Sequence, residues 1–460
     1  MSERRIVILG GGPAGIAAAD FLAAEGRAPI LLDRESMPGG LCRTLSFKGF
    51  LFDIGGHRFL TPYDEIRKIW LDIMGDEMLH VRRMSRIYYQ NRFFKYPLST
   101  FNALGNLGVF ESFRCMVSFV VFHLFPMKGD SFESWMSNRF GKRLYEIFFK
   151  TYSEKLWGIP CKSLSSEWAD QRIEGLSLWV AIKRALFGNW GKGPKTLTEE
   201  FLYPRTGPGE FYRRYQARAE KAGAEFKLGQ SVTRIRHENG RVVSVVSKTG
   251  PNSAELETPA EGLISSLALP AMIEMLDPPA PPEVREAAKK LRFRNYMVVN
   301  VILDRENLFP DQWIYVQSAT VRLARIQNYK NWSPDMVPDS KMTSLGLEYF
   351  SSSDESFWTL PDAEVIAWAL ADLERIGVVA QTELKDAFVV RQKNAYPIYE
   401  IGYRKNLDIV RQFLAGIPNL QTTGRAGLFR YCNSDLAMKT GLHAAKNLLG
   451  QGPLDLWSIS

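Results

Sequence analysis

Residues 4–59 read RRIVILGGGPAGIAAADFLAAEGRAPILLDRESMPGGLCRTLSFKGFLFDIGGHRF, and this stretch decides the fold. The apolar, β-branched run Ile6-Val7-Ile8-Leu9 leads into the glycine pattern Gly10-x-Gly12-x-x-Gly15, and a helix-period segment from Ile16 to Ala24 follows. This order predicts a strand, a glycine turn and a helix whose N-terminus faces an anion. The same order is typical of a dinucleotide-binding unit.

A second strand, Pro29 to Leu32, ends on Asp33, roughly twenty residues past the glycines, where a dinucleotide's ribose hydroxyls need an acceptor. Gly10 allows the tight turn, Gly12 lets backbone N–H groups approach a pyrophosphate, and Gly15 lets helix and strand pack closely. The glycine pattern alone arises by chance in glycine-rich loops. With strand, helix and acid all in place, we expect dinucleotide binding rather than a purely structural turn.

Further glycines follow in Gly39-Gly40 and Gly55-Gly56-His57, and an NAD-binding fold does not need them. This region resembles the extended FAD-binding region of the family that contains UDP-galactopyranose mutase, protoporphyrinogen oxidase, amine oxidases and phytoene desaturases. The resemblance implies FAD as cofactor. The FAD-binding residues that it implies are Gly10, Gly12, Pro13, Ala14, Gly15, Asp33, Arg34, Gly40, Leu41, Arg43, Gly56, His57, Val232, Gly424, Arg425 and Asp435.

The composition of the 460 residues, 45% hydrophobic and 23% charged, indicates a globular protein of two or three domains. The first strand begins close to Met1, and the longest apolar run, Cys115 to Met127, is too short to span a bilayer, so we expect a cytoplasmic protein. The four cysteines form no CxxC pair, and neither a disulfide framework nor a metal site is expected.

The net charge of +8 would suit a phosphorylated substrate, an anionic membrane surface or nucleic acid, although the charge is dispersed. Basic and aromatic residues alternate from Arg82 to Tyr96, as in proteins that bind single-stranded nucleic acid. This segment also reads as a hairpin that turns at Gln90-Asn91. With no RNA-binding motif nearby, we do not expect nucleic acid as a partner.

The pattern beyond the first unit predicts an α/β chain of three parts. Segments 1–80, 200–276 and 412–460 are expected to form a discontiguous, Rossmann-like FAD-binding domain. Residues 98–199 read as a helical insert, whose clearest helix is Phe132 to Tyr152. Residues 81–97 and 283–411 are expected to form a largely antiparallel sheet domain, beginning after the proline-rich boundary at Asp277 to Pro282.

Three motifs narrow the resemblance to the UDP-galactopyranose mutases. They are Tyr152-Ser153-Glu154-Lys155-Leu156-Trp157-Gly158, Gly424-Arg425-Ala426-Gly427-Leu428-Phe429-Arg430-Tyr431 and Gly55-Gly56-His57-Arg58-Phe59-Leu60-Thr61. Further matches are Arg325-Ile326 with Lys330 downstream, Glu348-Tyr349 and Tyr396-Pro397. The matches lie in the same order from end to end, and the chain therefore resembles a mutase in more than its FAD-binding region.

This resemblance implies a pyranose/furanose mutase without net redox chemistry, in which N5 of reduced flavin attacks the anomeric carbon of a nucleotide sugar. Tyr152 and Trp157 would stack the base, and Arg325, Tyr396 and Tyr431 would hold the diphosphate. The catalytic residues would be these last three and His57 beside the flavin. Arg172, the first arginine of a further family motif, is counted with the substrate-binding residues.

The second arginine of that motif is Leu176 here, and the family's aspartate after Tyr431 is replaced by Cys432-Asn433-Ser434-Asp435. The alternative is therefore an FAD-dependent oxidase or dehydrogenase of the protoporphyrinogen oxidase or amine oxidase type. A flavin-binding protein without catalysis is a third hypothesis. The aromatic surface of the insert would meet a membrane or a partner subunit, for instance in a homodimer.

Overall fold

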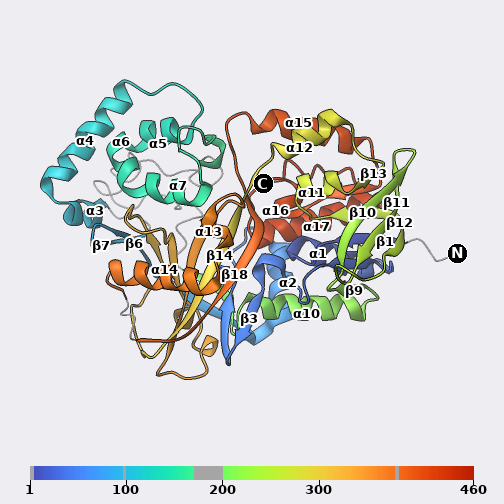
Figure 1. Ribbon diagram of the computed structural model, residues 1–460, viewed down its shortest axis with the longest axis horizontal. Coiled ribbons are helices and arrows are strands. Elements are labelled where there is room, and N and C mark those ends of the chain that lie inside the picture. The colour runs from blue at the N-terminus through green and yellow to red at the C-terminus, as the bar shows by residue number, and fades with distance from the viewer. Residues whose placement is uncertain (1–4, 97–99, 170–199, 379–382, 460) are drawn as a thin grey trace.

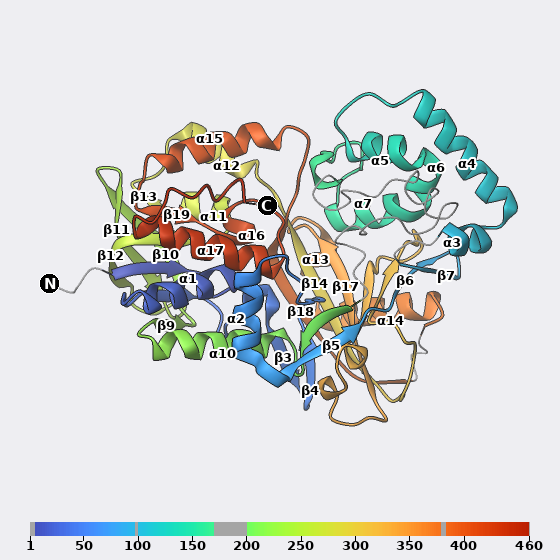
Figure 2. The same ribbon diagram turned by 180° about the vertical axis from the view of Figure 1, so that it is seen from behind.

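The structure is a computed structural model, and it describes residues 5–96, 100–169, 200–378 and 383–459. Two large sheets organise these residues, and a group of helices extends from one end of the second sheet (Figures 1 and 2). Arg172, Leu176 and the glycine-rich segment 188–195 lie outside the described residues.

The larger sheet has eight strands in the order β13-β10-β11-β12-β1-β2-β9, with β19 beside β12. The pairs β1–β2, β1–β12, β2–β9 and β12–β19 are parallel, and this confirms the predicted nucleotide-binding unit. The strands are β1 (Arg5–Leu9), β2 (Ile30–Asp33), β9 (Glu225–Leu228), β10 (Ser231–Glu238), β11 (Arg241–Lys248), β12 (Leu256–Ser265), β13 (Leu276–Asp277) and β19 (Leu420–Thr422).

Helices from distant parts of the sequence cover this sheet (Figure 1). They are α1 (Pro13–Ala24), α2 (Asp64–Met74), α10 (Pro208–Lys221), α11 (Leu269–Glu274), α16 (Gly424–Gly427) and α17 (Ser434–Leu448). The closest helix contact is between α1 and α17, where a side chain at Gly441 would overlap the carbonyl oxygen of Ala14. The first and last segments of the chain are therefore held together through their backbones.

Two further helices, α12 (Pro282–Lys289) and α15 (Tyr403–Ala415), fall in the range predicted for the antiparallel sheet domain. They pack instead against each other and α11, beside the eight-stranded sheet, where Val284, Val410 and Leu414 join its hydrophobic core. Their amphipathic faces are complementary, and this packing could not be read from the order of the elements.

The second sheet has seven strands in the order β18-β14-β17-β16-β15-β6-β7. Only β15 and β6 pair in parallel, so the prediction of a largely antiparallel sheet is confirmed. Helix α14 (Asp362–Arg375) covers one face. The strands are β6 (Ser85–Tyr89), β7 (Arg92–Lys95), β14 (Phe293–Leu303), β15 (Trp313–Val316), β16 (Arg325–Asn328), β17 (Thr343–Ser351) and β18 (Leu384–Pro397).

The insert contains α3 (Thr100–Leu107), α4 (Val109–Leu124), α5 (Phe132–Phe140), α6 (Lys142–Tyr145) and α7 (Thr151–Trp157). The prediction of one helix over Phe132 to Tyr152 was wrong. Gly141 breaks it with a φ of 79°, at a place where a side chain would lie 2.6 Å from the backbone nitrogen of Phe119. The predicted apolar stripe is nevertheless core, because Met136, Phe140, Ile147 and Phe148 are buried.

Asp53 connects two small sheets to the rest of the protein. It ends β4 (Phe50–Asp53), which pairs with β3 (Thr44–Phe47), and its carboxylate accepts hydrogen bonds from the Tyr203 hydroxyl at 2.6 Å and the Thr44 hydroxyl at 2.7 Å. Tyr203 lies on β8 (Glu200–Pro204), beside β5 (Met78–Arg82). The Tyr329 hydroxyl donates to the Asp53 carbonyl at 2.9 Å. Burial raises the pKa of Asp53 to about 7, although both side-chain hydrogen bonds lower it.

We expect Asp53→Asn to remove a pH dependence of stability. The folded carboxyl keeps its proton up to about pH 7, whereas the unfolded carboxyl releases it near pH 4, so its stabilising contribution is complete below pH 4 and is lost as the pH rises to 7. The variant should gain stability relative to the wild type over this window, by on the order of 4 kcal/mol at most.

Denaturant unfolding at several pH values between 4 and 7.5 measures the difference. The exposed Asp304→Asn variant is the control and should follow the wild type. Parallel curves for the wild type and Asp53→Asn would contradict the assignment.

Candidate active site

The N-terminus of α1 offers backbone N–H groups to an anion. The helix begins at Pro13 after Gly12, and no side chain caps it. Gly10 has a φ of 99°, and a side chain at Gly15 would overlap the Gly10 carbonyl oxygen. A side chain at Gly40, whose φ is 56°, would lie 3.1 Å from the Gly12 Cα. These loops can approach each other only because they lack side chains, as a pyrophosphate cradle requires.

Asp33 stands at the end of β2, as the sequence predicts for a ribose-binding acid. Its carboxylate accepts hydrogen bonds from the backbone N–H groups of Gly11 and, at 2.7 Å, of Glu35. Burial raises the pKa of Asp33, and these hydrogen bonds oppose the rise. Asp33 therefore fixes the glycine loop against the second strand.

Arg43 stabilises the Gly39-Gly40 loop that faces the glycine turn. It is 5% exposed, donates to the Gly40 carbonyl at 2.9 Å and pairs with Glu35, so its contacts hold the loop in shape. Arg34 is largely exposed. Leu41 and Val232 are partly buried and pack against the main core.

The N-terminus of α17 also lacks a side-chain cap, and it lies beside that of α1, because Ala14 packs with Cys432 and Ala437. Gly424 has a φ of 72°, and a side chain there would come within 3.2 Å of Ala14 Cβ. Its backbone N–H donates to the Thr440 hydroxyl at 3.0 Å. Asp435 is buried in the first turn of α17. The structure thus brings both predicted ends of the cofactor site together.

The loop Gly55-Gly56-His57 lies on the seven-stranded sheet. A side chain at Gly56 would lie 2.7 Å from the amide nitrogen of Gln327, and one at Gly55 would lie 3.2 Å from the Tyr296 hydroxyl. The Tyr296 hydroxyl and the Gln327 amide oxygen are buried without a hydrogen-bond partner among the described residues. Such groups need partners, and the polar edge of an isoalloxazine ring would supply them, so the site fits FAD.

His57 is held as a neutral imidazole. Burial lowers its pKa to about 3, and the nearby Arg425 and Arg325 add to this shift, while the bond to Gly55 opposes it. Nδ1 lies 3.0 Å from the Gly55 carbonyl oxygen. Neutral Nδ1–H therefore donates to that carbonyl, which leaves Nε2 as an acceptor.

Arg325 and Glu348 form a buried, two-pronged ion pair. The Arg325 guanidinium donates to the two carboxylate oxygens at 2.7 and 2.9 Å, and Gln327 donates to one of them at 2.9 Å. Glu348 is fully buried. Burial is the largest influence and disfavours the charge on Arg325, but Glu348 and the surrounding tyrosines together raise the pKa of Arg325 well above its ordinary value.

Arg425 is the second cation of the site. Its guanidinium lies 4.5 Å from the ring centre of Tyr431 and 5.1 Å from that of Tyr396, and these two rings stack at 5.7 Å. It donates to the Cys432 carbonyl at 2.7 and 3.1 Å and to the Ala395 carbonyl at 3.3 Å. No carboxylate pairs with it in the part of the chain that the structure describes. Its charge is therefore uncompensated.

The insert contributes Tyr152, whose ring meets Tyr315 edge-on at 5.3 Å. Tyr152, Arg325 and Tyr396 lie close enough to influence one another electrostatically. Trp157 is fully buried between Trp168 and Tyr399, and its stacking on a base stays a prediction. It supports Tyr396 edge-on at 6.4 Å.

Sequence reasoning assigned no role to Glu348, Gln327 or Tyr296. Glu348 appears in the sequence analysis only as part of a motif match. Gln327 lies two residues after Arg325 and therefore shares its face of β16. This strand alternation could have identified Gln327 as a site residue. Together the groups make a site with two cations, one carboxylate, a neutral imidazole and several phenols, which favours an anionic ligand.

Comparison with known proteins identifies the family. Residues 13–449 match the family described as flavin containing amine oxidoreductase. The curated relatives include 1-hydroxycarotenoid 3,4-desaturase of Flavobacterium sp. (strain P99-3), 21% identical over 55% of this chain and 55% of the relative. Inactive all-trans-retinol 13,14-reductase of Danio rerio is 34% identical over 16% of this chain and 13% of its own length. The matches thus span about half or less of these relatives.

Solved structures share the fold across nearly the whole chain. Reduced UDP-galactopyranose mutase has a TM-score of 0.83 and 22% identity, over 98% of this chain and 95% of its own. A putative protoporphyrinogen oxidase from Exiguobacterium sp. 255-15 has a TM-score of 0.70 and 19% identity, over 96% and 98%. The predicted fold class and FAD as cofactor are confirmed. The chain belongs to the flavin containing amine oxidoreductase family.

Proposed function

We propose that this flavoenzyme acts on a nucleotide sugar, as a pyranose/furanose mutase or a close relative of one. The observation that carries the proposal is the charge of the site, where Arg325 and Arg425 are both near His57 and Glu348 is the one carboxylate among the described residues that pairs with either of them. A diphosphate would supply the missing negative charge. The likeness to UDP-galactopyranose mutase in fold is consistent with this substrate class.

FAD would be held by the glycine loop after β1, by Asp33 and by the N-termini of α1 and α17. When bound and reduced, it would supply a nucleophilic, electron-rich ring next to the substrate. The protein's own groups would bind and orient the sugar nucleotide.

Each polar group has a definable task in this proposal. A departing diphosphate gathers negative charge, which the guanidinium of Arg325 and the phenol hydroxyls of Tyr396 and Tyr431 would stabilise. His57, neutral and fixed by the Gly55 carbonyl, would accept a hydrogen bond from a sugar hydroxyl through Nε2. Tyr152 would flank the base from the insert.

The alternative is an oxidoreductase like other members of the family, and the desaturase among the sequence relatives favours it. An amine substrate fits poorly, because a protonated amine would meet two guanidinium groups. A polyene would need an apolar channel, whereas tyrosine hydroxyls and arginines gather here. These observations support the nucleotide sugar over both oxidative substrates.

We expect the reduced holoenzyme to isomerise the sugar ring of a nucleotide sugar. Anaerobic incubation of the reduced holoenzyme with UDP- and dTDP-sugars should convert one of them to its ring isomer, with no net consumption of reductant. Chromatography of the sugar nucleotides measures the product. Turnover of an amine, a porphyrinogen or a carotenoid with oxygen or a quinone, and none of any nucleotide sugar, would contradict the proposal.

We expect Arg325→Lys to weaken the binding of UDP. The lysine keeps the charge that compensates Glu348 but loses the planar fork, so the affinity for UDP should fall roughly ten- to hundredfold, since charge-assisted hydrogen bonds contribute about 1.5–3 kcal/mol. Fluorescence titration of the holoenzyme measures it.

Arg322→Lys is the matched control, because Arg322 pairs with Glu355 just outside the site. It should bind UDP as the wild type does. Equal affinities for UDP in the wild type and Arg325→Lys would remove Arg325 from the proposed diphosphate site.

A further inference from the structure

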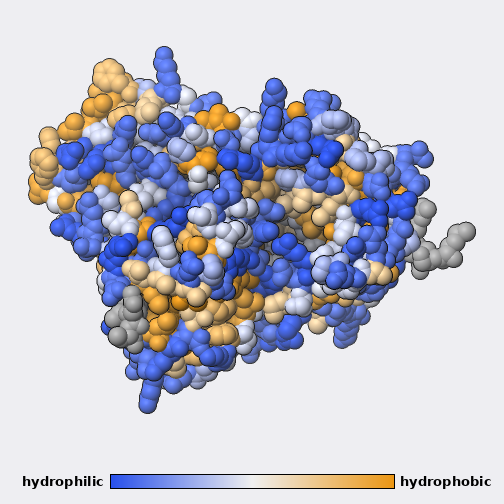
Figure 3. All heavy atoms as spheres, viewed as in Figure 1, coloured by the Kyte–Doolittle hydropathy of each residue, from blue (hydrophilic) through white to orange (hydrophobic). Residues whose placement is uncertain are grey.

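Helix α4 carries a continuous apolar surface that no described residue covers. Its outward side chains recur every three or four residues, so they form one stripe along the helix. Those more than 60% exposed are Val109, Phe110, Phe113, Leu124 and, just past the helix, Phe125; Met116, Val117, Val120 and Val121 are about half exposed. Figure 3 shows hydrophobic residues gathered at the end of the molecule where Figure 1 places α4.

The opposite side of α4 already supplies its packing contacts. Cys115 and Phe119 are buried toward the insert, and the Ser118 hydroxyl accepts a hydrogen bond from the Arg143 backbone at 3.1 Å. The outward stripe is therefore not needed to hold the helix in place. An exposed apolar stripe that runs the length of a helix indicates a binding surface.

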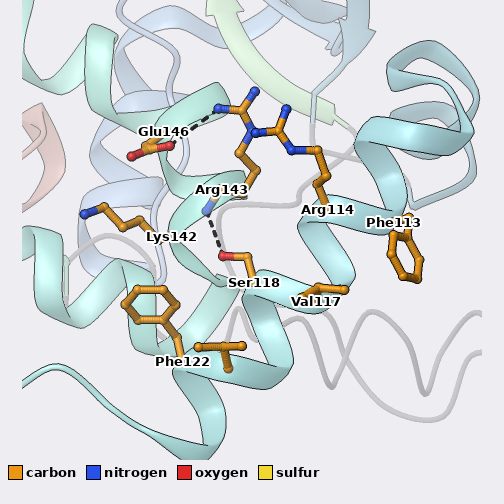
Figure 4. A pocket seen from close by; sticks show the side chains of 9 residues that line it. Phe113, Arg114, Val117, Ser118, Phe122, Lys142, Arg143 and Glu146 are labelled. Carbon is orange, nitrogen blue, oxygen red and sulfur yellow. Dashed lines mark hydrogen bonds and ion pairs between the residues drawn. The ribbon is translucent and has the colours of Figure 1, made fainter.

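A groove of ≈ 420 Å³ lies between α4 and α6, and Figure 4 shows its lining. Phe113, Val117 and Phe122 give it apolar walls. Its cations are paired: Arg143 with Glu111 and Glu146, Arg114 with Glu111, and Lys142 with Glu133. The groove is thus apolar and nearly neutral, and the excess charge of the surface lies elsewhere.

Unpaired cations flank both ends of the helix. Near its start, exposed Arg92 donates to the carbonyl of Asn106, and exposed Lys95 lies on the same strand, β7. Exposed Lys128 follows its end. None of the three forms an ion pair with another described residue. From residue 78 to 110 the sequence has five basic residues and no acidic one.

We propose that α4 binds in the plane of a membrane surface that contains anionic phospholipid. Its apolar stripe would enter the acyl boundary, while Arg92, Lys95 and Lys128 would contact phosphate groups at both ends. No helix in the described ranges is long and apolar enough to cross a bilayer. The contact is therefore one of a helix lying on the surface.

The charges favour lipid over a second copy of this chain. In a twofold dimer, antiparallel α4 helices would set Arg92 against Lys128 of the other copy, and parallel helices would set each cation against its equivalent. Both arrangements bring like charges together around the apolar contact, and neither places negative charges opposite these cations. Anionic lipid headgroups would supply those negative charges.

Sedimentation of the holoprotein with vesicles tests the proposal. The protein should bind vesicles of phosphatidylcholine with phosphatidylglycerol and bind phosphatidylcholine alone more weakly. Phe113→Asp should reduce binding to the mixed vesicles at least about tenfold, since a buried phenylalanine contributes roughly 1.5–3 kcal/mol. The double variant Arg92→Glu with Lys128→Glu should lose the preference for anionic vesicles.

Leu71→Asp, at an exposed leucine of α2 far from the insert, is the matched control and should bind as the wild type does. Sedimentation equilibrium of each variant establishes its mass. The proposal is overturned if the wild type binds neither kind of vesicle, or if Phe113→Asp binds them as strongly as the wild type does. It is also overturned if the protein forms a dimer through α4 that Phe113→Asp dissociates.

Discussion

The ion pair between Arg325 and Glu348 determines the charge of the active centre. The pairing register of the strands β16 and β17 brings the two residues together. The two residues stand directly opposite each other on β16 and β17. A fully buried carboxylate is costly without a partner, and Arg325 with Gln327 satisfies it. A slip of one residue in either strand would turn that strand's side chain to the other face of the sheet and separate Arg325 from Glu348. The seven-stranded sheet thus fixes one wall of the site.

The opposite wall depends on backbone contacts that only glycine allows. Gly441 lets α17 lie against Ala14 of α1, and Gly15 lets α1 lie against the first strand. These contacts bring two uncapped helix N-termini side by side, next to the loop of His57. The glycine loops and helix N-termini would position FAD, and the seven-stranded sheet presents Arg325. These two walls come from distant parts of the sequence and meet only in the folded chain.

Sequence alone predicted the parts that depend on local rules. The glycine pattern, Asp33 and the alternating strands follow from turn geometry and side-chain period, and the structure agrees with them. Sequence failed where distant packing decides. The break at Gly141 depends on its contact with Phe119. The roles of Gln327 and Tyr296 appear only once the His57 loop lies over them.

In the proposed function, the excess positive charge near His57 holds a diphosphate. A crystal structure of the reduced holoenzyme soaked with a UDP-sugar tests it most directly. We expect electron density for the diphosphate between Arg325 and the Tyr396–Tyr431 pair, with the sugar toward His57. If the nucleotide binds elsewhere, or if an amine or a polyene binds in this position and the nucleotide does not, the proposed diphosphate site is wrong.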